Sequence, residues 1–396
     1  MQRRDFLKTL GAGLLTVQLP GLAYALAPAG YERLLILVEL KGGNDGLNTV
    51  VPFASSDYYR LRPSLAIARE QVLQLNESSG LHPALAPLLP LWQAGQLAIV
   101  QGVGYPEPNL SHFRSIDIWD SASNSQQYLS DGWLTRLFQH YPPGDAYASD
   151  GVILGSQTLG PLAGGARAVV LTTPDSFARQ ARLVQSHAAG GSGALAHILK
   201  VEDDIRHAAA ELGGSGGGMA AMAPAGARDE GKLPAAPGAF GQAIRTLLAT
   251  LDGGARIAVA RLTLTGFDTH SNQPATQARL LGELAEGLAA LQQGLDARGR
   301  WRDTLLMSYA EFGRRPRQNG NNGTDHGTAN AHFVLGGRVK GGLYGQAPQL
   351  ADISDGNLPY AVDFRQLYAT AIEQWWGKPS AAMLGNTFRP LPLLAV

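Results

Sequence analysis

The sequence predicts an α/β protein with a largely parallel central sheet and helices on both of its faces. Short apolar segments typical of buried strands recur along the chain, and glycine or polar residues follow them. Amphipathic segments with the spacing of a helix lie between them. Strands that alternate with helices along a chain form parallel sheets, and such sheets are covered on both faces.

Three predicted strands and two predicted helices lie in the first half of the chain. Residues 33–40 (RLLILVEL) predict a buried strand that ends in a glycine-rich loop. Residues 84–93 predict a helix, and residues 97–103 (LAIVQGV) predict the next strand. A second helix is expected to begin at Ser111, and residues 166–171 (ARAVVL) predict a further buried strand.

The second half of the chain repeats the pattern. A helix is predicted over 239–251, and a strand over 256–264 (RIAVARLTL). Leucines recur at three- and four-residue steps over 281–295, which predicts a helix that packs on the sheet. Residues 304–309 (TLLMSY) predict another strand, and residues 363–376 predict the last helix.

The N-terminal residues have the features of a twin-arginine signal peptide. Arg3 and Arg4 are followed by the short apolar segment 9–22, and residues 23–25 (AYA) offer a cleavage site. We therefore expect residues 1–25 to direct the folded protein to the twin-arginine translocase, and thus to the periplasm or out of the cell.

The rest of the chain, residues 26–396, is expected to form a single domain. A glycine-, alanine- and proline-rich segment at about 213–238 predicts a flexible loop within it. Charged residues make up 16% of the chain and the formal net charge is +0, so nothing indicates a nucleic-acid-binding surface. No apolar run after the signal is long enough for a stable membrane span. The chain has no cysteine, which excludes disulfides, thiolate metal sites and cysteine nucleophiles.

Acidic, histidine and hydroxyl side chains follow several of the predicted strands. Because ligands bind beyond the carboxyl ends of strands in open α/β sheets, we expect these side chains to share one edge of the sheet. They are Asp45, Ser111, Asp268, His270 and Glu311, and the following loop adds Asp325 and His326. Carboxylates gathered in a cleft repel one another unless a cation binds. Mixed oxygen and imidazole ligands suit zinc or manganese, and magnesium or calcium less well.

Ser111, at a predicted helix start beside these residues, is the candidate nucleophile, and His112 is expected to assist it. Local sequence leaves other interpretations open. Asp45 also fits an Asx turn, Ser111 a helix cap and His112 helix packing. Glu311 also fits an ion pair with Arg314 or Arg315.

Two positions favour a metal site more strongly. Asp268 and His270, two ligating residue types one residue apart, directly follow a predicted strand. His326 lies in the glycine-flanked sequence GTDHG, where it favours a ligand role, and Asp325 does so less strongly.

Over nearly its whole length the chain resembles DUF1501, a bacterial family of proteins exported by the twin-arginine route. The segments that carry the resemblance are 39–51 (ELKGGNDGLNTVV), 81–91 (LHPALAPLLPL), 110–113 (LSHF), 309–314 (YAEFGR) and 323–330 (GTDHGTAN). That family in turn resembles the alkaline phosphatase and sulfatase superfamily. The resemblance implies an alkaline-phosphatase-like fold.

The superfamily resemblance also implies roles for four residues. Asp45 corresponds to the metal-binding aspartate after the first strand, and Ser111 to the nucleophile that opens a later helix. Asp268 and His270 correspond to the aspartate and histidine that bind one of the metals.

The sequence departs from the superfamily pattern after the predicted strand at 304–309. Glu311 stands where an aspartate of an Asp-His pair is expected, and no histidine follows it directly. Either Glu311 binds metal and His326 supplies the last histidine, or Asp325 and His326 form the pair and Glu311 supports them.

The expected function is that of a periplasmic, metal-dependent hydrolase of phosphate or related anionic esters, either small or polymeric. The formylglycine signature of standard sulfatases is absent after Ser111. The alternative is a non-catalytic binding or assembly protein that keeps the fold with a degenerate metal site.

Overall fold

The computed structural model describes residues 30–147, 149–173, 208 and 236–395. The predicted signal peptide and most of the predicted flexible loop at 213–238 therefore lie outside the described residues. A nine-stranded sheet is the centre of the described part. In spatial order its strands are β13 (Gly342–Gly345), β5 (Leu97–Gly104), β12 (Asn330–Leu335), β9 (Thr304–Tyr309), β1 (Leu34–Lys41), β8 (Ile257–Thr265), β6 (Ser149–Leu154) and β7 (Ala168–Val170), with β14 (Val362–Asp363) paired to β5.

Most neighbouring strands run parallel. β1 lies between β8 and β9 and is parallel to both, and β8, β6 and β7 continue in the same direction. β12 is antiparallel to β5 and to β9. The predicted α/β class with a largely parallel sheet is confirmed, whereas the reversed direction of β12 could not be read from its short apolar sequence.

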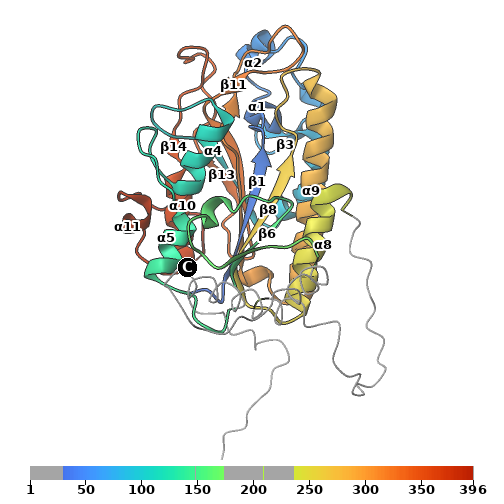
Figure 1. The fold of residues 1–396 in the computed structure, drawn as a ribbon. Coiled ribbons are helices and arrows are strands. Elements are labelled where there is room, and N and C mark those ends of the chain that lie inside the picture. The colour runs from blue at the N-terminus through green and yellow to red at the C-terminus, as the bar shows by residue number, and fades with distance from the viewer. Residues whose placement is uncertain (1–29, 148, 174–207, 209–235, 396) are drawn as a thin grey trace, which may run out of the picture.

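Helices cover both faces of the sheet, as Figure 1 shows. The longer ones are α4 (His112–Ser121), α5 (Trp133–His140), α8 (Gly238–Asp252) and α9 (Gln273–Ala297). The short ones are α1 (Gly46–Thr49), α2 (Ser56–Leu61), α3 (Leu89–Gln93), α10 (Arg365–Ala369) and α11 (Ala381–Leu384). α8 and α9 lie on one face, and α4, α5 and α10 lie on the other.

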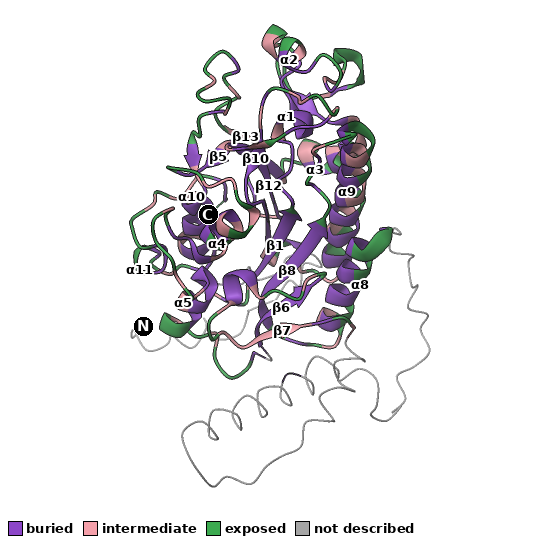
Figure 2. Cartoon of the chain, turned by 45° about the horizontal axis from the view of Figure 1, so that its top comes forward, coloured by how far each residue is buried: buried purple, intermediate pink, exposed green. Residues whose placement is uncertain are grey.

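Alternation along β1 explains the two covered faces. Ile36 and Val38 belong to an apolar cluster shared with α8 and α9, whereas Leu35 and Leu37 belong to a second cluster shared with α4, α5 and α10. Successive side chains of a strand point to opposite faces, so an all-apolar strand needs a layer on each side. Figure 2 shows the resulting buried centre of the molecule.

Two predicted helices differ in detail. The segment predicted as one helix over 84–93 forms a 3-10 turn (Pro83–Leu88) followed by α3, because Pro87 and Pro90 lack the N–H groups that a continuous α-helix needs. The last predicted helix begins as α10 and continues as a π-helical turn over Thr370–Trp375.

Smaller elements surround the edge of the sheet where β1, β8 and β9 end. A three-stranded sheet contains β2 (Val50–Val51), β4 (Gly80–Leu81) and β3 (Leu73–Gln74), and a two-stranded sheet contains β10 (Gly313–Arg314) and β11 (His326–Gly327). Other 3-10 turns are Arg69–Gln71, Gly160–Leu162 and Trp301–Asp303. Among the helices of the described residues, none combines the length and apolar character that crossing a bilayer requires.

Candidate metal centre

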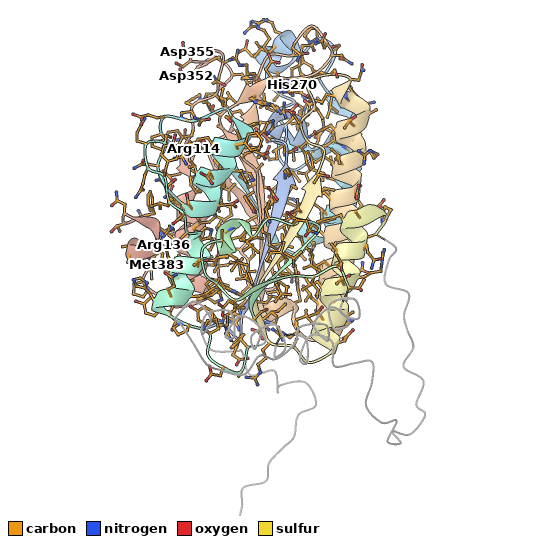
Figure 3. All side chains as sticks on the ribbon, in the orientation of Figure 1. Arg114, Arg136, His270, Asp352, Asp355 and Met383 are labelled. Carbon is orange, nitrogen blue, oxygen red and sulfur yellow. The ribbon has the colours of Figure 1, made fainter. Side chains whose placement is uncertain are left out.

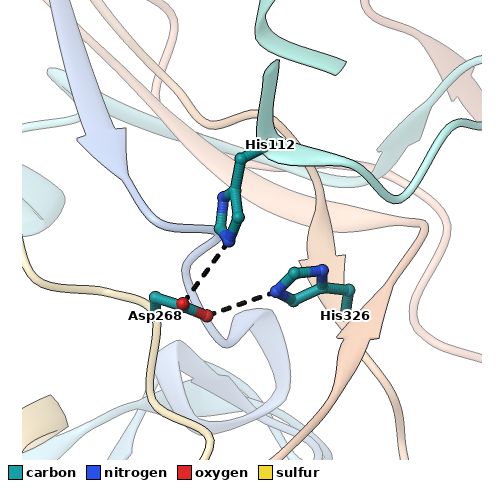
Figure 4. Close-up of side chains that lie close together, drawn as sticks. All are labelled: His112, Asp268 and His326. Carbon is teal, nitrogen blue, oxygen red and sulfur yellow. Dashed lines mark hydrogen bonds and ion pairs between the residues drawn. The ribbon is translucent and has the colours of Figure 1, made fainter. Parts of the chain in front are cut away.

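Two histidines and one aspartate meet where the parallel strands end. Asp268 follows β8, His112 is the first residue of α4, and His326 is the first residue of β11. One ligating atom from each lies within 4.8 Å of the other two. His112 Nε2 is 3.4 Å from Asp268 Oδ2, and His326 Nε2 is 3.2 Å from Asp268 Oδ1, as Figure 4 shows.

Glu311 orients His112. His112 Nδ1 is 3.1 Å from Glu311 Oε1, and the backbone N–H groups of Gly42 and Gly43 donate to the same carboxylate at 2.9–3.1 Å. An ionised carboxylate only accepts hydrogen bonds, so Nδ1 carries the proton and Nε2 presents a lone pair towards Asp268. Gly42 has a φ of 116°, and a Cβ there would collide with the backbone at Asp268, so this cradle requires glycine.

A backbone carbonyl orients His326 in the same way. His326 Nδ1 is 2.8 Å from the oxygen of Leu110, the residue before the α4 N-cap, Ser111. A carbonyl oxygen only accepts, so Nε2 of the neutral ring again presents its lone pair to the cluster. Burial lowers the pKa of His326, and the nearby Arg314 guanidinium contributes to that shift. Metal-binding histidines have this arrangement, with the distal nitrogen held by a carboxylate or a carbonyl.

Arg314 fixes Asp268. Partial burial by itself would raise the pKa of Asp268, but the hydrogen bond and charge of Arg314, with the neighbouring histidines, lower it to about 2. Arg314 Nη2 is 2.8 Å from Asp268 Oδ1, and the buried guanidinium also donates to the carbonyls of Gly43, Thr324 and Phe267. The predicted alternative of an ion pair between Glu311 and Arg314 or Arg315 is wrong, because Glu311 faces the Gly42 and Gly43 amides and His112.

His270 adds a third imidazole. His270 Nε2 lies 3.0 Å from Asp268 Oδ1 and 2.9 Å from His326 Nε2, and its Nδ1 is 3.4 Å from Asp325 Oδ1. A neutral His270 that carries its proton on Nε2 can donate to the lone pair of His326 Nε2 at that distance. Asp325 contacts Nδ1 of His270, whereas Asp268 contacts Nε2 on the other side of the ring. Asp325 also accepts a hydrogen bond from Asn319 at 3.1 Å.

Asp45, predicted as a metal ligand, is not part of this cluster and has other partners. Its carboxylate is fully buried and receives hydrogen bonds from Arg62 at 2.5 and 3.0 Å and from Gln273 at 2.5 Å. It also accepts from the backbone N–H of Leu47 at 3.2 Å, which caps α1. A buried guanidinium already neutralises the carboxylate, so the Asx-turn alternative describes this residue.

Ser111 and His112 differ from their predicted roles in detail. Ser111 is the exposed N-cap of α4, but its hydroxyl makes no capping hydrogen bond. Its two chain neighbours both contact the cluster: the carbonyl of Leu110 accepts from His326, and His112 belongs to the cluster itself. The backbone of Ser111 is therefore adjacent to the cluster. His112 was expected to assist the nucleophile, whereas its contacts place it among the candidate ligands.

A cavity of about 1260 Å³ opens beside the cluster. His112, Asp268 and Glu311 line it together with Lys41 and residues of α4. In Figure 3, His270 lies near the end of the molecule where β1 and β8 end, and Arg114 lies on α4. The sequence predicted neither this cavity nor the ion pair of Arg314 with Asp268, because both form between segments that are distant in the sequence.

A family model described as "Protein of unknown function (DUF1501)" matches residues 98–384. The chain belongs to this family. The sequence-based resemblance to DUF1501 is thereby confirmed. A comparison of this DUF1501 protein with curated proteins finds no match.

Solved structures similar to this DUF1501 protein share little sequence with it. The lipoteichoic acid synthase LtaP from Listeria monocytogenes has 10% identity and a TM-score of 0.37, over 88% of this chain and 72% of that one. The C-terminal periplasmic domain of EptC from Escherichia coli, in complex with Zn, has 9% identity and a TM-score of 0.38, over 79% and 74%. An alkaline phosphatase superfamily protein from Vibrio parahaemolyticus has 9% identity and a TM-score of 0.37, over 83% and 65%.

Proposed function

We propose that this DUF1501 protein is a metal-dependent hydrolase of phosphate or related anionic esters. The observation that carries the proposal is the convergence of two imidazole Nε2 atoms on the Asp268 carboxylate, with an acceptor holding each Nδ1 proton. Such a mixed nitrogen and oxygen donor set fits zinc or manganese better than magnesium or calcium. His112, Asp268 and His326 would hold the ion, and His270 is the adjacent fourth donor.

The chain's own residues prepare this site. Glu311 keeps the proton of His112 on Nδ1, and Arg314 keeps Asp268 ionised and oriented. A divalent ion bound there would supply Lewis-acid stabilisation of the negative oxygens of an ester. The first turn of α4 contributes the partial positive charge of a helix N-terminus to the same place.

Ser111 is the proposed nucleophile. Its exposure at the α4 N-cap, next to His112, supports this role. Its Oγ would lose its proton to solvent and attack the ester's phosphorus or sulfur atom, and the bond to the alcohol oxygen would break as that oxygen takes up a proton from solvent. Water would later hydrolyse the ester bond to serine, which releases the anion and restores the Ser111 hydroxyl. We also propose that the N-terminal twin-arginine signal exports the protein, already folded, to the periplasm or out of the cell.

Metal content and turnover together test the proposal. Purified protein should hold at least one equivalent of zinc or manganese by elemental mass spectrometry, and should hydrolyse p-nitrophenyl phosphate or a related diester or sulfate. Ser111→Ala should lose turnover and keep its metal, whereas His326→Ala should lose both. Full activity in Ser111→Ala, or hydrolysis that survives complete metal removal, would overturn the mechanism.

A second candidate is a non-catalytic binding or assembly protein with the same metal site. One observation favours it: Arg62 pairs with Asp45, so the described residues offer one group of candidate metal ligands, where the resemblance implied more than one metal. One tightly bound metal equivalent without turnover of any of these esters would select this alternative.

A further inference from the structure

The cavity beside the metal cluster extends well beyond it. His112 and Asp268 line it near the cluster, and Asp120 and Glu39 line it elsewhere. His112 and Asp120 belong to the same helix, α4, and at 1.5 Å per residue they are about 12 Å apart along its axis. A ligand that contacts both must therefore be much longer than the anionic group held at the cluster.

The polar side chains that line the cavity far from the cluster belong to a network of hydrogen bonds and one ion pair. Glu39 is paired with Arg261 Nη2 at 2.7 Å, and Arg261 Nε donates to the Tyr309 hydroxyl at 2.8 Å. That hydroxyl lies 3.5 Å from Asp120 Oδ1. Burial raises the pKa of Asp120 to about 7, with Arg261 opposing and Glu39 reinforcing the shift. Near neutral pH, Asp120 is therefore able both to donate and to accept a hydrogen bond, which suits hydroxyl groups.

Exposed aromatic side chains lie on the α4 side of the same cavity. Three large hydrophobic side chains are exposed within the described residues, namely Phe113 (88%), Tyr128 (77%) and Tyr360 (41%), and the first two line this cavity. The guanidinium of Arg114 stacks on Tyr128 at 3.9 Å and also pairs with Asp117 at 3.2 Å. Exposed apolar surface of this kind marks a binding site when it adjoins a cleft.

We propose that this cavity binds a carbohydrate, which is the alcohol part of the ester cleaved at the cluster. This inference rests on the proposed hydrolase function for the ester, but the sugar site is defined by different residues. A sugar ring has an apolar C–H face that packs on an aromatic ring, and hydroxyls that bond to carboxyl groups and threonine. Phe113, Tyr128, Asp120 and Thr158 supply these groups along the cavity.

The charge pattern argues against a cationic ligand. Glu39 and Asp117 are already paired with Arg261 and Arg114, and Lys41 adds a positive charge to the lining. Asp131 also lines the cavity and accepts from Ser130 Oγ at 3.0 Å, so an ammonium group would have that carboxylate as a partner, whereas neutral hydroxyls need none.

Direct binding of neutral sugars tests the proposal without requiring turnover. The probe is a pool of short, fluorescently labelled hexose and N-acetylhexosamine oligosaccharides, titrated into the metal-loaded protein. Wild-type protein should bind members of the pool, and Tyr128→Ala and Asp120→Leu should each weaken that binding about tenfold while the metal content stays unchanged. Tyr360→Ala, an exposed aromatic outside this cavity, is the matched control and should bind like wild type. Thermal melting verifies that each variant is folded.

The outcomes separate this inference from the proposed function. Sugar binding that persists in metal-free His326→Ala supports the carbohydrate site, even if no ester is hydrolysed. A protein that holds metal and hydrolyses p-nitrophenyl phosphate but binds no sugar in the pool would overturn the carbohydrate site alone. Binding of tetramethylammonium in place of sugar, abolished by Tyr128→Ala, would overturn it in favour of a cationic ligand.

Discussion

Asp45 and Asp268 follow two neighbouring parallel strands, β1 and β8, yet they have opposite surroundings. Asp45 is fully buried, and Arg62 and Gln273 bind both of its oxygens. Asp268 is 45% exposed, and Arg314 binds one of its oxygens while three imidazoles face it. The difference teaches that an acid at a strand end becomes a candidate ligand only when its neighbours leave an oxygen accessible. Removing the partners of each acid tests this comparison.

Removing Arg62 should have the largest effect. Arg62→Leu leaves the Asp45 carboxylate buried without its cation, and breaking one side of a buried ion pair costs about 3–5 kcal/mol of unfolding free energy. Urea denaturation monitored by circular dichroism measures this loss. The metal content of the folded fraction should not change. A loss below about 1 kcal/mol would contradict a structural role for the Asp45–Arg62 pair.

The histidines offer a parallel contrast in pH dependence. Both ring nitrogens of His332 are buried without a hydrogen-bond partner, unlike those of His326, and burial lowers the pKa of His332 to about 3. As the pH falls below 6.5, the unfolded chain takes up a proton that the folded chain refuses, so stability is lost between pH 6.5 and about 3. At pH 4 this linkage costs about 3 kcal/mol.

His332→Leu provides the measurement for that contrast. Its urea-unfolding free energy should fall less between pH 7 and pH 4 than that of wild type, by about 3 kcal/mol. Equal acid dependence in the two proteins would show that the folded chain protonates His332 as readily as the unfolded chain does.

Asp268→Asn should weaken metal binding about 100-fold, or about 2.7 kcal/mol, because the amide removes the negative charge among the ligands. Competition with a fluorescent zinc chelator measures the affinity. Asp45→Asn is the matched control at the neighbouring strand end, and its zinc affinity should equal that of wild type. A comparable loss of zinc affinity in both variants would contradict the conclusion that only Asp268 is a metal ligand.

Glu311→Gln should have the smallest of these effects, about tenfold weaker metal binding, because an outer carboxylate acts by orienting His112. The glutamine carbonyl can still accept from the Gly42 and Gly43 amides, so stability should change little. A loss as large as that of Asp268→Asn would instead indicate that Glu311 binds the metal directly.

The sequence by itself determined the α/β class, the main strands and the family. Buried strands with apolar residues on both faces need a helical layer on each side, and that pattern is local. It also predicted that Asp45, Ser111 and five other residues would lie at one edge, because parallel strands end together; the five are Asp268, His270, Glu311, Asp325 and His326. The structure brings these five residues into one connected group of contacts.

Only the tertiary structure decided what each of these residues contacts. Glu311 faces the amides of Gly42 and Gly43, which are more than 260 residues away in sequence, and so it orients His112. Asp45 is occupied by Arg62, whose own position depends on the backbone of Pro316. Such partners meet through packing of distant segments, and no periodicity or motif in the sequence encodes which guanidinium reaches which carboxylate. Whether an acid forms a buried ion pair, as Asp45 does, or stays accessible as a candidate ligand, as Asp268 does, is therefore decided by the fold.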